Sequence, residues 1–223
     1  MNQRINNGDC SRTILLEASH KTNFVYEIES VTFSKEQLRH INSINTQAKI
    51  KDRISEIQQL NGCFNFVDIE SKMFMNNLVL IDSFLPQITS EALKLFFTTN
   101  LASIKDITIL LERNNPLKFN TENNHRFYEY KLKRLLAELA LGMGANENWS
   151  KKRITNRGYS FPEGDKHLAT SPTYSEKTIN EYLFNNSQFE IANAIDNNSG
   201  TIENYGDKWI FKLNLQISLN NKQ

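Results

Sequence analysis

Carboxylates and a lysine alternate over residues 68–72, which have the sequence Asp-Ile-Glu-Ser-Lys. Carboxylate oxygens are ligands that Mg²⁺ prefers, so Asp68 and Glu70 are candidate metal ligands. Lys72 would then be the basic partner, because a cationic side chain beside such a site neutralises charge that develops on a phosphate. Glu70 and Lys72 are therefore candidate catalytic residues. The alternative is a solvated strand end, since the tripeptide Glu-x-Lys is very common.

Basic side chains gather in two further segments, where they could contact the phosphates of a nucleic acid. The first segment is a predicted helix, and the second follows it closely along the chain. The alternative for both is a charged surface that contacts only solvent. The candidate DNA-binding residues in these segments are Lys131, Lys133, Arg134, Lys151, Lys152, Arg153 and Arg157.

The end of the chain carries polar side chains at alternate positions of a predicted strand. Apolar residues from Trp209 to Ile217 alternate strictly with polar ones, so the two kinds should lie on opposite faces. Lys212, Asn214 and Gln216 would project from the polar face. Amide side chains can pair with adenine edges or reach phosphates, which adds these three residues to the DNA-binding candidates.

The strong local signatures of several enzyme classes are absent from the sequence. It contains no Gly-rich phosphate loop, no HExxH, no GxSxG and no EF-hand loop. Glu138, on a predicted helix, is either a carboxylate beside a metal or, more commonly for such a position, an exposed salt-bridging residue. The histidines lack metal-ligand spacing and are interpreted as surface or structural residues: His20, His40, His125 and His167.

Two strands near the start of the chain are expected to position part of these candidates. Residues 22–31 alternate apolar and polar side chains and are rich in β-forming residues, which predicts a strand. Residues 63–70 alternate in the same way, so the two strands could pair. In the second strand we expect one face to carry Phe64, Phe66 and Asp68, and the other to carry Asn65, Val67 and Ile69.

Helical periodicity predicts most of the remaining elements. Ser34 and Gln37 match a capping box that begins a polar helical stretch, in two pieces, as far as Leu60. Pro86 is expected to separate helices over residues 72–84 and 89–99. Further helices are predicted over residues 101–113 and 175–186, a hairpin over 156–170, and a terminal hairpin that turns at Gly206-Asp207.

The longest predicted helix covers residues 125–144 and ends at Gly142 and Gly144. Its apolar residues recur at helical spacing and form a broad stripe that should face the core. The stripe is expected to contain Phe127, Tyr130, Leu132, Leu135, Leu136, Leu139 and Leu141.

Length and composition indicate one folded domain in a reducing compartment. The chain has 223 residues, a net charge of +1 and 39% hydrophobic residues, so any basic surface must be local. Cys10 and Cys63 lie far apart and indicate neither a zinc site nor a disulfide framework. No signal peptide or membrane span is visible, so we expect a soluble, cytoplasmic protein without a membrane partner.

Four sequence blocks resemble one known family when they are taken in order along the chain. Residues 15–28, LLEASHKTNFVYEI, are similar to an LLNAS-x-x-TNF block of HpaII-type restriction endonucleases. Residues 130–143 resemble that family's KIKRLL…ALGM helix, residues 181–190 its YLF-N-T-KF helix, and residues 208–219 its terminal KLNLQIRF strand. Together the blocks extend over nearly the whole chain.

The resemblance implies a type II enzyme that binds duplex DNA at a short palindrome, CCGG in the best-known member, and cleaves its backbone with Mg²⁺. Such an enzyme acts with a cognate DNA methyltransferase as its functional partner, and a homodimer is possible. Ser19 and Asn23 lie in the first matched block, where short polar side chains could support a phosphate or a metal-bound water. Capping or turn formation is the competing explanation for both.

The segment ahead of Leu15 differs from what the same resemblance implies. The family's strand with a (D/E)-x-K signature precedes the first block, whereas residues 1–14 hold no Asp or Glu followed by x-Lys. We therefore expect one restriction-endonuclease-like domain over residues 1–223, incomplete at its N-terminal side, with an α+β fold of a mixed β-sheet flanked by helices. The alternative functions are a non-catalytic DNA-binding remnant and a helical protein-interaction domain.

Overall fold

The computed structural model describes residues 12–150, 162–163, 166–167, 176–191 and 199–220. In these residues the helices are η1 (His20–Thr22, a 3-10 helix), α1 (Lys35–Ser43), α2 (Lys49–Gln59), α3 (Lys72–Ile81), α4 (Leu85–Thr98), α5 (Ile104–Asn114), α6 (Phe127–Ala140) and α7 (Glu176–Asn186). The strands are β1 (Arg12–Leu16), β2 (Asn23–Glu29), β3 (Cys63–Ile69), β4 (Pro162–Glu163), β5 (Lys166–His167), β6 (Ser187–Phe189), β7 (Ile202–Tyr205), β8 (Lys208–Asn214) and β9 (Ile217–Asn220).

The strands form two main antiparallel sheets, which confirms the predicted α+β class. A four-stranded sheet, called here the long sheet, has the order β3-β2-β8-β7. A three-stranded sheet, called here the short sheet, has the order β1-β9-β6. The fragments β4 and β5 also pair, in the middle of the predicted hairpin over 156–170, whose other residues lie outside the described ranges.

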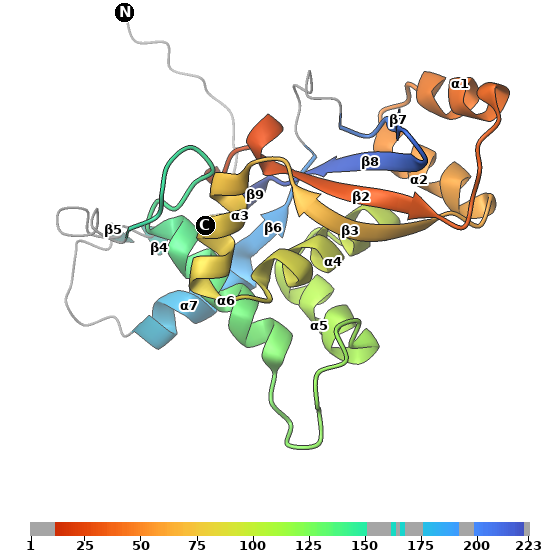
Figure 1. The fold of residues 1–223 in the computed structure, drawn as a ribbon. Helices are drawn as coiled ribbons and strands as arrows, with labels where there is room; N and C mark the ends of the chain where they lie inside the picture. Colours follow the sequence, from red (N-terminus) through yellow and green to blue (C-terminus); the bar gives the residue numbers. More distant parts are fainter. Residues whose placement is uncertain (1–11, 151–161, 164–165, 168–175, 192–198, 221–223) are drawn as a thin grey trace, which may run out of the picture.

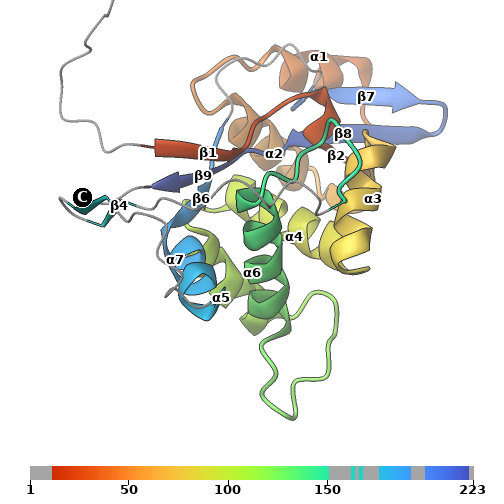
Figure 2. The same ribbon diagram turned by 90° about the vertical axis from the view of Figure 1, so that its left-hand side faces the viewer.

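Helices cover one side of both sheets (Figure 1). The strands of the long sheet lie above α4, and α5, α6 and α7 pack beneath the short sheet (Figure 2). The side chains between these layers form one hydrophobic core, which includes Phe24, Tyr26, Leu93, Leu136 and Ile217. No helix among the described residues is long and apolar enough to cross a membrane.

The predicted pairing of the two early strands is confirmed, but the predicted faces of the second strand are partly wrong. Val25 lies opposite Asp68 and Tyr26 lies opposite Phe66, so Val67 is an extra residue in the ladder. A β-bulge of this kind shifts the alternation by one position. Ile69 is consequently buried, and Val67 remains exposed.

Capping residues explain where several helices begin. Ser34 and Gln37 form the predicted capping box, in which each side chain accepts a backbone N–H of the other residue. Pro86 does not separate two helices but lies in the first turn of α4, where its missing N–H has no cost because that position has no intrahelical partner. The expected start of this helix at Thr89 was therefore four residues late.

The apolar stripe of α6 is rotated relative to the prediction. Tyr128 is buried, and its hydroxyl donates to Asn115 Oδ1 at 3.0 Å and accepts the N–H of Leu117 at 2.9 Å. Tyr130, which was expected in the stripe, is 62% exposed. The long loop between α5 and α6 supplies the partners that hold Tyr128 inside.

The terminal run of alternating residues forms two strands rather than one. β7 and β8 make the predicted hairpin around Gly206, which has a φ of +67°. After Asn214, however, the chain leaves the long sheet and continues as β9 in the short sheet. The alternation persists across this change, because Phe211, Leu213, Leu215, Ile217 and Leu219 are all buried.

Candidate functional site

A group of polar side chains lies on the solvent side of the long sheet, where β2, β3 and β8 meet. The Asn23 amide donates to Glu70 Oε2 at 2.8 Å, and Lys212 Nζ lies 3.5 Å from Glu70 Oε1. The backbone N–H of Glu70 donates to the carbonyl of Asn23 at 2.9 Å, which fixes the residue just after β3. These three residues and Asn214 are called the Glu70 cluster below.

Asn214 lies directly opposite Asn23 in the β2–β8 register. Its amide nitrogen donates to Asn23 Oδ1 and to the carbonyl of Ser19, each at 2.6 Å. Asn214 is only 4% exposed, and its Oδ1 is buried without a hydrogen-bond partner in the structure. Burial leaves Asn214 little surface for contact with DNA, so its place in the DNA interface stays a prediction.

Asp68 and Lys72 form an ion pair beside the Glu70 cluster, four residues apart across the start of α3. Asp68 also accepts the N–H of Ile69 at 2.8 Å. The structure thus joins Lys72 to Asp68 and joins Lys212 to Glu70. The side chains of Asp68 and Glu70 are 34% and 37% exposed, so both carboxylates can be reached from solvent.

The donor set at this end of the long sheet fits Mg²⁺. Mg²⁺ is usually held by only one or two carboxylates together with waters and phosphate oxygens of the substrate. Asp68 and Glu70 supply the carboxylates, and Asn214 Oδ1 is a buried oxygen that lacks a partner. Within the described ranges, no group of three or more His, Cys, Asp or Glu residues could hold a metal by itself.

Ser19 caps the short helix η1, which agrees with the alternative interpretation of this residue as a capping residue. Its hydroxyl accepts the N–H of Lys21 at 3.2 Å, and its own N–H donates to Thr22 Oγ1 at 3.0 Å. This capping box turns the chain sharply between β1 and β2. Ser19 therefore contributes to the site by placing its carbonyl against Asn214.

The lysines predicted to bind DNA on α6 are held by carboxylates within the fold. Lys131 pairs with Asp82 and lies 5.3 Å from the centre of the Phe84 ring. Lys133 pairs with Glu129 at 2.7 Å and with Glu181 at 2.5 Å. Although partial burial by itself lowers the pKa of Lys133, the hydrogen bonds to Glu129 and Glu181 raise it above its ordinary value.

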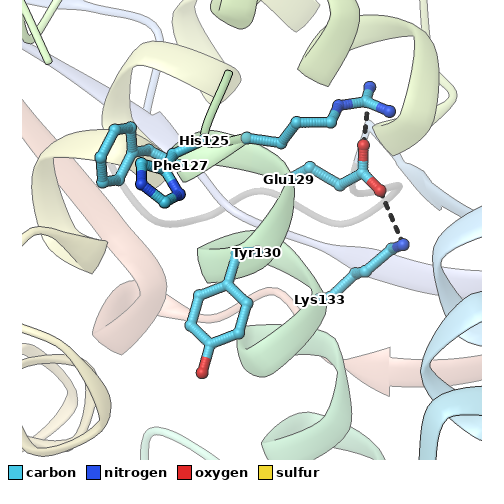
Figure 3. Close-up of a pocket in the computed structure, with 6 residues that line it drawn as sticks. His125, Phe127, Glu129, Tyr130 and Lys133 are labelled. Atoms are coloured by element: carbon cyan, nitrogen blue, oxygen red, sulfur yellow. Dashed lines mark hydrogen bonds and ion pairs between the residues drawn. The ribbon is translucent and has the colours of Figure 1, made fainter. Parts of the chain in front are cut away.

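A pocket of about 380 Å³ opens beside the first two turns of α6 (Figure 3). Glu129 lies at its centre and pairs with both Arg126 and Lys133. His125, Phe127 and Tyr130 supply the aromatic part of the lining. Among the lining residues that the structure describes, the arginine and the lysine are thus both paired with the one glutamate.

The remaining basic candidates differ in what the structure says of them. Arg134 is half-buried and forms no ion pair with any residue that the structure describes. Its contact with DNA stays a prediction. The other basic candidates lie outside the described residues, and these are Lys151, Lys152, Arg153 and Arg157.

Glu138 is not the exposed residue that the commoner interpretation expected, and a place beside a metal stays a prediction. This carboxylate is buried and accepts the indole N–H of Trp149 at 2.8 Å. The histidines that can be assessed, His20, His40 and His125, are exposed, as expected for surface residues.

Sequence reasoning also missed two carboxylates that the fold brings to the polar side of the sheets. Glu203 of β7 lies 3.7 Å from Lys212, and Glu190, just after β6, is buried against Gln216. Only the alternation of β7 could have indicated Glu203. Nothing in the sequence brings Glu190 close to Gln216, because 25 residues separate them along the chain.

Comparison with known proteins assigns this chain to a family. The family model of the HpaII restriction endonuclease matches residues 7–219, and the chain belongs to this family. One curated relative is the type II restriction enzyme HpaII of Haemophilus parainfluenzae, which is 36% identical over 207 residues. The match covers 93% of this chain but only 56% of that relative, so the chain spans little more than half of the relative's length. No solved structure matches.

Proposed function

We propose that this chain recognises a short palindrome of the CCGG type in duplex DNA and cleaves the phosphodiester backbone there, as part of a type II restriction system. Membership of the HpaII restriction endonuclease family supports this proposal. The observation that carries it is the position of Asp68 and Glu70, which lie beside Lys72 and Lys212 at one end of the long sheet. Carboxylates with adjacent lysines are what metal-dependent hydrolysis of a phosphodiester requires.

In this proposal Asp68 and Glu70 would hold Mg²⁺, with the Asn214 amide oxygen as a further donor. The metal would supply charge neutralisation at the phosphate and a more acidic bound water. The residues of the chain itself have distinct tasks. Asn23 and Asn214 fix the orientation of Glu70, and the ammonium group of Lys212 would approach the phosphate from the neighbouring strand.

The partners in this proposal follow from the palindrome and from the family. A two-fold symmetric DNA site suits a homodimer, because each subunit then contacts one half of the site. The cognate DNA methyltransferase would protect the same sequence and need not touch this chain. The enzyme would act in the cytoplasm, where a reducing environment suits the free and exposed thiol of Cys63.

A cleavage assay with the purified chain tests the proposal. A supercoiled plasmid with one CCGG site and a matched plasmid without it are incubated with Mg²⁺ or with EDTA. We expect nicked or linear product only from the plasmid with the site, and only with Mg²⁺. Equal cleavage of the two plasmids would contradict site recognition.

A second candidate function is DNA binding without cleavage. The observation that favours it is that both carboxylates already have cationic partners within the fold, Asp68 with Lys72 and Glu70 with Lys212. A gel-shift assay at two salt concentrations separates the candidates, since contacts with phosphates make affinity fall steeply with salt. A salt-sensitive shift without cleavage supports the binding function, and no shift at either salt concentration supports a protein-interaction domain.

A further inference from the structure

The outer face of the short sheet carries a row of hydrogen-bonding side chains around one buried carboxylate. Gln216, Ser218 and Asn220 project from this face of the β8–β9 run, and Gln188 and Glu190 project from β6 and the residue after it. The opposite face of the sheet is apolar and belongs to the core. A set of polar groups linked by hydrogen bonds therefore lies on one side of the short sheet.

Glu190 is the centre of this set. Its Oε1 accepts Gln188 Nε2 at 3.1 Å and the Ser218 hydroxyl, and its Oε2 accepts Gln216 Nε2 at 3.0 Å and pairs with Arg12. Each of the two carboxylate oxygens thus has two partners, and the side chain is almost wholly buried. Since each partner must hold its place to keep this buried charge satisfied, Glu190 fixes the directions of the side chains around it.

Arg12 retains free hydrogen-bonding capacity after its pairing with Glu190. Its guanidinium carries five N–H donors, only part of which the carboxylate occupies, and its side chain is 46% exposed. Gln216 is half-buried and keeps a second N–H and an amide oxygen. A guanidinium held on one edge and open on the other is suited to contact guanine O6 and N7 in the major groove.

We propose that Arg12 is a specificity-determining residue that contacts a guanine of the recognition sequence, and that Glu190 is a positioning residue that holds Arg12 and Gln216 in place for it. This proposal rests on the proposed function, because it concerns how the same enzyme would distinguish its DNA site. Glu190 is not a metal ligand in this arrangement, since each of its oxygens has two partners, whereas each oxygen of Glu70 has one. The long sheet would thus contact the sugar-phosphate backbone of the DNA, and the short sheet would contact its bases.

Competition binding with a modified base tests this division. The probes are a CCGG duplex and the same duplex with 7-deazaguanine, which lacks only the N7 acceptor in the major groove. Binding is measured without Mg²⁺ for wild type, Arg12→Lys and Glu190→Gln. The matched control is Arg126→Lys, because Arg126 is also an exposed arginine paired with a glutamate, Glu129.

We expect wild type and Arg126→Lys to prefer the normal duplex by about tenfold or more, as for a bidentate arginine contact. Arg12→Lys should lose most of this preference and bind the normal duplex about 10- to 100-fold more weakly, because the flexible ammonium group lacks the rigid planar fork that holds donors toward both Glu190 and the base. Glu190→Gln should lose the preference while its weak, salt-sensitive binding to unrelated DNA persists.

The outcomes separate this inference from the proposed function. If wild type prefers the normal duplex and Arg12→Lys prefers it equally, the assignment of Arg12 is wrong. If wild type binds DNA but does not distinguish the two duplexes, no N7 contact exists and the inference fails alone. If wild type shows no salt-sensitive binding to any duplex, the proposed function itself fails. Should Glu190→Gln not fold, as circular dichroism would show, Arg12→Lys decides the question, since Arg12 is exposed.

Discussion

Two polar regions of this molecule carry residues predicted from the sequence to contact DNA, but they differ in how their side chains are paired. On α6, Lys131 and Lys133 are held by Asp82, Glu129 and Glu181, so each ammonium group already has a carboxylate. On the β8–β9 run, Gln216 donates to Glu190 and Asn220 donates to Gln188, so these polar side chains hold one another in place. The helix therefore uses its charges to hold α6 against its neighbours, whereas the half-buried amides of Gln216 and Asn220 each keep a second N–H.

This difference shows why charge content alone is a weak guide to a DNA interface. A cluster of three basic residues on one helix indicates phosphate binding until their partners are known. Amide side chains on a strand are a weaker indication of a DNA interface. A buried carboxylate can nevertheless hold such amides in fixed directions.

The largest effect is expected from Glu70→Gln in the Glu70 cluster. Loss of a metal-side carboxylate should lower the cleavage rate at least about 100-fold, because a metal that stabilises the transition state contributes several kcal/mol. Affinity for a CCGG duplex without metal should change only a few-fold. The control is Glu27→Gln, which removes a carboxylate paired with Lys208 on the same sheet. Cleavage by Glu70→Gln at the wild-type rate would remove Glu70 from the site.

Lys133→Met tests whether the cations of α6 are structural. The change leaves Glu181 without its lysine and deprives Glu129 of one of two cationic partners, so we expect a loss of about 1–2 kcal/mol in the free energy of unfolding, measured in urea. DNA affinity and its dependence on salt should stay as in wild type. A fall of about one in the salt slope would show instead that Lys133 contacts a phosphate.

Tyr26→Phe tests the apolar face of the long sheet, beneath the polar side chains. The buried Tyr26 hydroxyl donates to the Ser90 carbonyl at 2.8 Å, so its removal should cost about 1 kcal/mol at pH 7. Burial, with a smaller effect of Glu91, raises the pKa of Tyr26 well above its ordinary value.

The same pKa shift predicts how this cost depends on pH. A raised pKa in the folded state means that the contribution of Tyr26 is complete below the unfolded pKa of about 10 and is lost as the pH rises further. Wild type should therefore lose stability above pH 10 faster than the variant does. Urea unfolding at pH 7 and above pH 10 measures this, and parallel loss in both proteins would contradict it.

Tyr130→Ala should have the smallest effect. Tyr130 is exposed at the pocket beside α6, and we expect a change below about 0.5 kcal/mol in the free energy of unfolding and no change in DNA affinity. Thermal denaturation and the gel-shift assay measure the two quantities. Weaker binding by this variant would mean that the pocket contacts DNA and that α6 belongs to the interface.

Much of the fold could be predicted because local patterns decide it. The alternation of β2 and the capping box of α1 involve neighbouring residues, so the sequence contains the whole signal. The bulge at Val67 could not be foreseen, since it depends on which residue of β3 pairs with Val25. The burial of Tyr128 in place of Tyr130 likewise depends on Asn115, which lies just after α5 and 13 residues before Tyr128.

The candidate site was predictable in its residue types but not in its pairings. Asp68, Glu70 and Lys72 share one segment, yet Glu70 contacts Lys212, which comes from the other end of the chain. The distant partners of Glu190 include Arg12 on β1 and Ser218 on β9, and the short sheet brings these strands together. Long-range contacts of this kind leave no periodic trace in a single sequence.

Residues 208–220 pass from the long sheet into the short sheet without a break in their alternation. This continuity limits the changes that the chain can accept during evolution. Residues 215–216 belong to no strand and would pass for a tolerant connection. One residue inserted there, however, would exchange the two faces of β9 relative to β8. Ile217 and Leu219 would turn outward, and the partners of Glu190 would turn into the core. We therefore expect length changes among natural variants to be absent at this point and frequent in the loop between α5 and α6.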